Sequence, residues 1–81
     1  MKARIQRITF DRRGRLASAV FRCRESGLRQ SVTVRVIWKD VSGDWCWFKA
    51  DWCSPENWRQ IVPMIQRIES AVDTIQSDDD G

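Results

Sequence analysis

Cysteine supplies the strongest candidate nucleophile in this chain of 81 residues, which contains three cysteines and no histidine. Cys53 stands directly before Ser54, where a helix is expected to begin, and the positive end of a helix dipole favours a thiolate. A nucleophilic cysteine also needs a general base, and the usual one at neutral pH, histidine, is absent. We therefore expect Cys53 to be structural, and we expect a protein that is not an enzyme and has no catalytic residues.

The spacing of the cysteines and glycines indicates no metal or cofactor site. A structural zinc site needs four Cys or His ligands in closely spaced pairs, whereas Cys46 and Cys53 are seven residues apart and Cys23 is distant from both. The odd number of cysteines also argues against a disulfide framework. The four glycines are isolated in turns or at the end of the sequence, which excludes a glycine-rich phosphate loop. We expect no metal, no cofactor, and thiols that stay reduced.

The overall composition predicts a soluble globular domain. Hydrophobic residues make up 42% of the sequence and charged residues 31%, a balance that excludes disordered, collagen-like and membrane-spanning chains. No run approaches the ~18 apolar residues of a membrane helix, and no apolar stretch follows the charged start at Met1. We expect no membrane partner and a cytoplasmic location, which is the host cytoplasm if a phage encodes the protein.

Charge is divided unequally along the chain. Residues 1–39 contain eleven Lys or Arg against two acids, a net charge of +9, whereas residues 40–81 have a net charge of −6. Eleven of the fourteen basic residues are arginine, whose planar fork of N–H donors binds carboxylate and phosphate groups. The basic half therefore indicates an anionic partner, either nucleic acid or an acidic protein surface. The alternative is that these cations are solvated and pair with acids of the expected helix.

Four strands are expected in the first two thirds of the chain, because apolar and polar residues alternate there and β-branched residues are frequent. The predicted strands cover residues 4–10, 16–24, 31–38 and 45–49. Gly, Asp and Ser cluster in the short turns between them. The predicted turns cover residues 11–14, 25–28 and 42–44.

One long helix is expected after the strands. Ser54 and Pro55 form a strong helix start, and apolar residues then recur at steps of three and four as far as Ile75. Pro63 lies within this stripe, which keeps its phase, so we expect one kinked helix rather than two. The acidic residues 77–81 have nothing to bury, and we expect a disordered tail after a single domain of residues 1–76.

The predicted fold is α+β: a four-stranded antiparallel meander followed by one long, Pro-kinked, amphipathic C-terminal helix that covers one face of the sheet, in two layers. Alternation assigns Val32, Val34, Val36 and Trp38 to the face under the helix, together with Ala17, Ala19, Phe21 and Cys23. The expected core contacts join Ile61, Ile65, Ile68 and Val72 to Val34, Val36, Phe21 and Phe48.

The fourth strand is apolar on both faces, and one helix cannot cover both. Phe48 and Trp52 point to one side with Cys46 and Ala50, whereas Trp45 and Trp47 point to the other. We place the first group under the helix, which leaves the two tryptophans on an uncovered face with arginines. The candidate partner-binding residues on this face are Arg7, Arg22, Arg24, Arg35, Ile37, Trp45 and Trp47. The alternative is that the strand twists and its tryptophans fold over the edge of the core.

An uncovered Arg/Trp face predicts a non-enzymatic protein-binding module, because these residue types anchor protein interfaces. The turn residues Arg12, Arg13 and Arg15 would extend the contact with an acidic surface. We expect an inhibitor or adaptor that occludes a surface of a larger host protein. Small size and the lack of any motif are typical of phage and mobile-element proteins that disable host machinery, such as anti-CRISPRs. A second copy of the chain could bind the same face and form a homodimer.

Nucleic acid is the alternative partner. In the order of its elements the chain resembles the strand-then-helix DNA-binding domains of phage-type integrases and AP2-like proteins, in which a sheet enters the major groove. The resemblance implies that arginines of the sheet and of the Arg12–Arg15 turn contact guanine and phosphate. The chain departs from these domains in having four expected strands rather than three, and the acidic residues 78–80 would repel phosphate.

Overall fold

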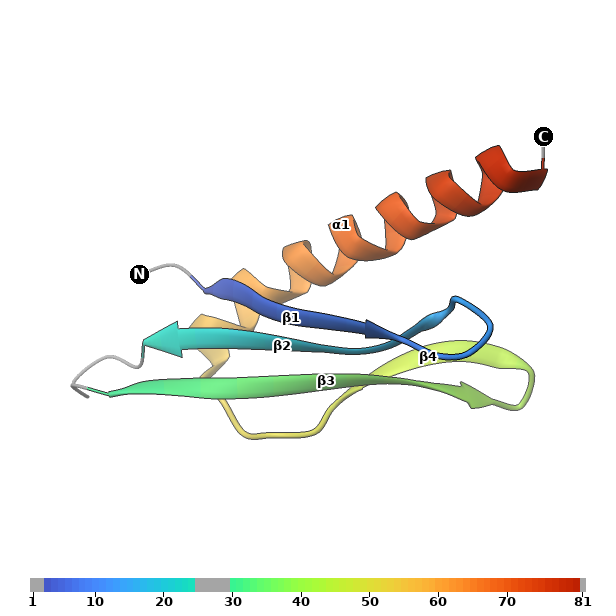
Figure 1. Ribbon diagram of the computed structural model, residues 1–81. Helices are drawn as coiled ribbons and strands as arrows, with labels where there is room; N and C mark the ends of the chain where they lie inside the picture. Colours follow the sequence, from blue (N-terminus) through green and yellow to red (C-terminus); the bar gives the residue numbers. More distant parts are fainter. Residues whose placement is uncertain (1–2, 25–29, 81) are drawn as a thin grey trace.

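The structure is a computed structural model that describes residues 3–24 and 30–80, with side chains as far as Thr74. It consists of one antiparallel sheet and one helix that lies against one face of it (Figure 1). The elements are β1 (Arg4–Phe10), β2 (Leu16–Arg24), β3 (Ser31–Val41), β4 (Asp44–Lys49) and α1 (Pro55–Asp80). The strands pair in the order β1-β2-β3-β4. The predicted two-layer α+β fold is confirmed.

The boundaries differ from the predicted ones in three places. β4 begins at Asp44 rather than at Trp45. β3 continues to Val41 rather than ending at Trp38. α1 is one uninterrupted helix that contains Pro63, and it continues to Asp80, past the domain boundary expected at residue 76. The disorder expected for residues 77–81 stays a prediction. The turn expected at 25–28 lies outside the described residues.

The two hairpins among the described residues close with the turn chemistry that their sequences supply. Between β1 and β2, the Asp11 carboxylate accepts the main-chain N–H groups of Arg13 at 2.8 Å and Arg15 at 2.9 Å. Between β3 and β4, Ser42 and Gly43 both have positive φ angles, 53° and 87°. Two consecutive positive φ angles match the right-handed twist of the flanking strands. The positions of both turns therefore follow from local sequence.

The start of α1 is fixed by a capping interaction. The Ser54 hydroxyl accepts the main-chain N–H of Asn57 at 3.2 Å, and the Ser54 carbonyl accepts that of Trp58 at 2.9 Å. Pro55 occupies the first helical position, where its missing N–H has no partner to lose. At the other end of the sequence, the main-chain N–H of Ala3 is donated to the Gln60 side chain at 3.0 Å, which ties the start of β1 to the helix.

The hydrophobic core lies between α1 and the central strands β2 and β3. The buried helix residues are Ile61, Ile65 and Ile68, and Val72 is partly buried against the same cluster. Their buried neighbours in the sheet include Ala19, Phe21, Cys23, Val34, Val36 and Trp38. These core contacts were predicted. The expected contribution of Phe48 is wrong, because its side chain is 47% exposed.

The helix does not cover the sheet along its whole length. Figure 1 shows that α1 starts close to the sheet and runs obliquely, so that its later turns rise away from the strands. In agreement with this, Ile68 is the last buried residue among the helix side chains that the structure describes, and the helix continues for twelve residues beyond it. Two cavities lie between the later turns of α1 and the sheet.

Candidate interaction surface

Pairing between β3 and β4 decides which side of the sheet the aromatic residues of β4 occupy. Trp47 lies opposite Trp38, and Trp45 lies opposite Asp40. Residues directly opposite each other in an antiparallel pair share a face. Trp38 is buried on the face that α1 covers, so both β4 tryptophans belong to this helix face. The prediction that Trp45 and Trp47 lie on the uncovered face is wrong.

Contacts with the helix and with the first hairpin explain this orientation. The rings of Trp47 and Trp58 have centroids 5.5 Å apart and planes inclined by 56°. The indole N–H of Trp45 is donated to the carbonyl oxygen of Leu16 at 3.2 Å. Two indoles remove more apolar area from water than Cys46 and Phe48 would. Trp58 at the helix start and the larger size of the indole rings were the available signals in the sequence.

The face of the sheet that α1 does not cover, called the open face below, is strongly basic. Five exposed arginines gather on its half near the start of β1 and β3 and the end of β2. This arginine cluster consists of Arg4, Arg7, Arg22, Arg24 and Arg35. Four of the five were predicted. Arg4 was missed because strict alternation separates it from Arg7, whereas an irregularity in the β1–β2 pairing between Ile5 and Arg7 turns both to the same side.

The arginine cluster contains a direct like-charge contact between neighbouring strands. Arg4 lies opposite Arg22, and Arg7 and Arg35 lie on either side of Val20. Like charges directly opposite each other destabilise a sheet. Within the part of the chain that the structure describes, no carboxylate forms an ion pair with these side chains. The described residues therefore supply no acid that neutralises the cluster.

The geometry at the end of the cluster suits an anionic group. Arg4, Arg22, Arg24 and Ser31 line a hollow of about 280 Å³. Guanidinium and hydroxyl donors that converge on one hollow can bind a carboxylate or a phosphate through several charge-assisted hydrogen bonds. The Asp51 carboxylate accepts the main-chain N–H of Arg35 at 2.9 Å, so it contributes to the edge of the sheet.

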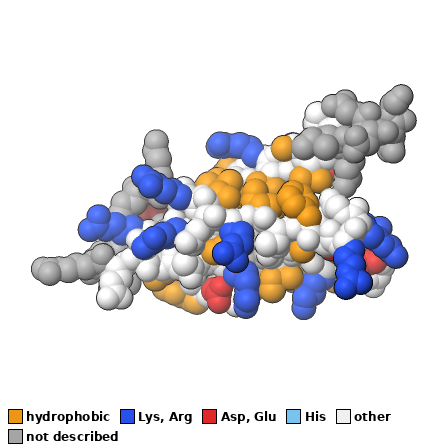
Figure 2. All heavy atoms as spheres, in the orientation of Figure 1, with side chains coloured by type: hydrophobic (Ala, Val, Ile, Leu, Met, Phe, Trp, Pro, Cys, Tyr) orange, Lys and Arg blue, Asp and Glu red, His pale blue; other side chains and the backbone are white. Residues whose placement is uncertain are grey.

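We call the other half of the open face the apolar half, because Ile37 and Phe48 are neighbours there; Thr9, Ser18 and Lys39 also belong to it. Ile37 lies opposite Phe48, with Val20 on the neighbouring strand, while Thr9 and Ser18 share a hydrogen bond of 2.6 Å between their hydroxyls. Figure 2, in which the strands lie in front of the start of α1, shows many Lys and Arg side chains with hydrophobic side chains between them and few acids. Ile37 was predicted here; Phe48 takes the place expected for the tryptophans.

The turn arginines do not join the arginine cluster. Arg12, Arg13 and Arg15 follow the end of β1, whereas Arg4 begins it, so the length of a seven-residue strand, roughly 20 Å, separates the two groups. The guanidinium of Arg15 lies 5.4 Å from the ring centroid of Trp45, which belongs to the helix face. The residues predicted to bind a partner therefore lie in two separate groups.

Among the side chains that the structure describes, no three His, Cys, Asp or Glu residues are grouped so that they could hold a metal ion. The described part of α1 is too polar to cross a membrane, and no other helix is present there. Comparison with known protein families, with characterised proteins and with solved structures finds no match.

Proposed function

We propose that this protein is a non-enzymatic binding module whose open face docks on an acidic surface of a larger protein and occludes it. The observation that supports this proposal is the arginine cluster, in which Arg4 and Arg22 face each other without a neutralising acid among the described residues. Such a like-charge contact destabilises the free protein. A partner that supplies carboxylates would convert this repulsion into charge-assisted hydrogen bonds.

The apolar half of the open face favours a protein partner over a bare polyanion. Phe48 is 47% exposed and lies beside Ile37. Burial of apolar area of this kind stabilises protein interfaces, in which arginine and aromatic residues carry much of the binding energy. The cluster and the apolar half adjoin on one face, so a single partner surface can contact both.

Nucleic acid remains the second candidate, and one structural observation favours it. The acids of α1, among them Glu69 and Asp73, lie in the layer opposite the open face. Their repulsion of phosphate is therefore weaker than the sequence alone suggested. The position of Trp45 and Trp47 on the helix face argues against nucleic acid, because the open face then lacks these two aromatic rings on which single-stranded bases would stack.

The proposed setting follows the same reasoning. Cys23 and Cys53 are buried and Cys46 is partly exposed, as suits thiols in the reducing cytoplasm of a cell or of a phage host. An inhibitor carried by a phage or mobile element is the form of the proposal that fits a small motif-free chain. Homodimer formation stays a prediction. It is no longer supported by exposed tryptophans on the open face, because Trp45 and Trp47 lie on the helix face.

The experiment compares two double variants that change the net charge equally. Arg22→Gln/Arg24→Gln alters the arginine cluster, whereas Arg59→Gln/Arg67→Gln alters two exposed arginines of α1. Each immobilised protein is incubated with nuclease-treated cell lysate, and the retained proteins are identified by mass spectrometry. We expect an acidic protein that the wild type and the α1 variant retain and that the cluster variant binds about tenfold or more weakly.

Two results would contradict the proposal. Equal loss in both double variants would show that net charge, and not the open face, governs retention. Binding of short single- or double-stranded DNA in place of any protein would favour the second candidate; the logarithm of its affinity should then fall with the logarithm of salt concentration by about 0.7–0.9 per phosphate contacted.

A further inference from the structure

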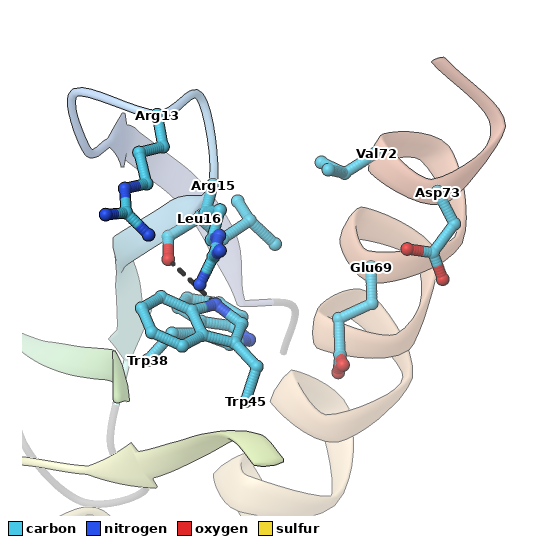
Figure 3. Close-up of a pocket in the computed structure, with 8 residues that line it drawn as sticks. All are labelled: Arg13, Arg15, Leu16, Trp38, Trp45, Glu69, Val72 and Asp73. Atoms are coloured by element: carbon cyan, nitrogen blue, oxygen red, sulfur yellow. Dashed lines mark hydrogen bonds between the residues drawn. The ribbon is translucent and has the colours of Figure 1, made fainter. Parts of the chain in front are cut away.

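One cavity between α1 and the sheet is separate from the open face. It has a volume of about 390 Å³ and is bounded by the β1–β2 turn, by the neighbouring parts of β3 and β4, and by α1 (Figure 3). We call it the turn–helix cavity. Its charged and aromatic lining residues are Arg13, Arg15, Trp38, Trp45, Glu69 and Asp73. Both layers of the fold therefore contribute to it.

The indole of Trp38 supplies an unused hydrogen-bond donor at this cavity. Trp38 is only 3% exposed, and its Nε1 has no hydrogen-bond partner among the described residues. The neighbouring indole of Trp45, in contrast, donates its N–H to Leu16. A buried donor without an acceptor destabilises a protein, because in the unfolded chain the same N–H bonds to water. Trp38 lines the cavity, so a ligand acceptor that reaches its Nε1 would supply the missing partner.

The charges of the cavity are divided between its two sides. Figure 3 shows Arg13 and Arg15 on the side of the turn, with Glu69 and Asp73 across the hollow on α1. No ion pair joins the two sides in the described structure. Burial of Glu69, together with the negative charge of Asp73, raises the pKa of the Glu69 carboxyl above its ordinary value. The lining of the cavity therefore has no cation on the helix side and no anion on the turn side.

Only a ligand with both charges satisfies this arrangement. An anion alone would face the two carboxylates of α1, and a cation alone would face the two guanidinium groups of the turn. A neutral apolar molecule would leave both sides and the Trp38 donor without partners. The apolar part of the lining, Leu16, Val72 and the ring of Trp45, can contact a hydrocarbon side chain that branches from the ligand beside its charged groups.

We propose that the turn–helix cavity binds a small zwitterion, an α-amino acid or a short peptide, with its carboxylate toward Arg13, Arg15 and Trp38 and its ammonium group toward Glu69 and Asp73. This proposal is independent of the open face, which lies on the other side of the sheet. It assigns a ligand to the helix face, where the arginine cluster has no part.

The test follows the indole N–H signals of ¹⁵N-labelled protein by NMR, with the Trp38 signal assigned by its loss in Trp38→Phe. The probes are L-leucine, L-phenylalanine and glycyl-leucine, with three controls that each lack at least one of the two charges. N-acetyl-leucine has no ammonium group, leucinamide has no carboxylate, and N-acetyl-leucinamide has neither. We expect at least one zwitterion to shift the Trp38 signal with a saturating dependence on concentration. The three controls should bind about tenfold or more weakly, since each lacks at least one charge-assisted contact. The relative response of the amino acids and the dipeptide distinguishes a free amino acid from a peptide.

A matched pair of variants locates the ammonium group. Glu69→Gln should weaken binding of the zwitterion about tenfold and leave N-acetyl-leucine unaffected, whereas Glu56→Gln, at an exposed acid of the first helical turn, should change neither. If no zwitterion shifts Trp38, or if N-acetyl-leucinamide binds as tightly as the zwitterion, the proposal is wrong. Equal binding of N-acetyl-leucine would overturn the role of the helix acids and with it the assignment of a zwitterion.

Discussion

Truncation of Ile65 to alanine tests the packing of α1 on the sheet. The Ile65 side chain is 0% exposed, between the helix and the central strands. Ile65→Ala removes three carbons, which lowers stability by about 2.4 kcal/mol at ~0.8 kcal/mol per buried methylene. A cavity that does not collapse adds up to about 2 kcal/mol, and the better helix propensity of alanine returns about 0.4 kcal/mol. We expect a net loss of about 3 kcal/mol.

That loss is large for this chain. Domains of this size unfold with a free energy of roughly 4–12 kcal/mol, and each kcal/mol shifts the midpoint of thermal unfolding by about 4–8 °C. The midpoint of Ile65→Ala, measured by circular dichroism, should therefore fall by about 12–24 °C. The matched control is Ile5→Ala, which removes the same atoms from a side chain that is 43% exposed; its loss should stay near 1 kcal/mol. If the two variants melt at the same temperature, α1 does not pack on the sheet as described.

Four further predictions follow from individual contacts. Trp47→Ala removes the ring packed on α1 and should lower the free energy of unfolding by about 3–5 kcal/mol in urea titrations. Trp52→Ala, at a side chain 74% exposed, should change it by less than ~0.5 kcal/mol. A larger loss in Trp52→Ala than in Trp47→Ala would contradict the orientation of β4. Asp11→Ala leaves two turn N–H groups without their acceptor and should lower the thermal midpoint by an amount equivalent to about 1–2 kcal/mol. Cys46 should react with a thiol reagent in the native protein before the two buried cysteines, and a single reaction rate for all three would show that the core opens globally. The pKa of Glu69 is raised in the folded protein, so the folded state binds the proton of this carboxyl more tightly than the unfolded state does, and stability should fall as pH rises above 4.5. Glu69→Gln should remove that part of the pH dependence. The variant should be more stable than the wild type at pH 7 but not below pH 4.

The fold was predictable because its signals are local. Ser54 and Pro55 mark the start of α1, and its stripe of isoleucines has the helical period; both are readable without any partner. The Asp11 carboxylate and the positive φ angle of Gly14 make a turn whatever lies around them. The core residues of β2 and β3 followed, because most of the alternate positions are polar, with Val20 and Ile37 among the exceptions.

The candidate site was less predictable because it depends on contacts between elements. β4 has an apolar side chain on both faces, so alternation alone could not choose between Trp47 and Phe48; the contact of Trp47 with Trp58 decides. In β1, strict alternation fails at the irregularity between Ile5 and Arg7, which no residue type in that strand indicates. The turn–helix cavity depends on the angle at which α1 leaves the sheet, and this angle follows from the packing of Ile61, Ile65 and Ile68 as a set.

The order of the elements along the chain has a kinetic consequence. Each strand pairs with the strand next to it in sequence, so the sheet requires only short loop closures, which favour rapid folding. The helix that covers it comes last, and during synthesis the first three strands leave the ribosome well before Ile65 does. During that interval no helix covers the apolar side chains of Phe21, Val34 and Val36. The outer edges of β1 and of the strand synthesised most recently are also unpaired. A pause in translation after β3 has left the ribosome and before Ile65 has done so would therefore expose the nascent chain to aggregation or to capture by a chaperone, whereas the completed helix closes the same surface.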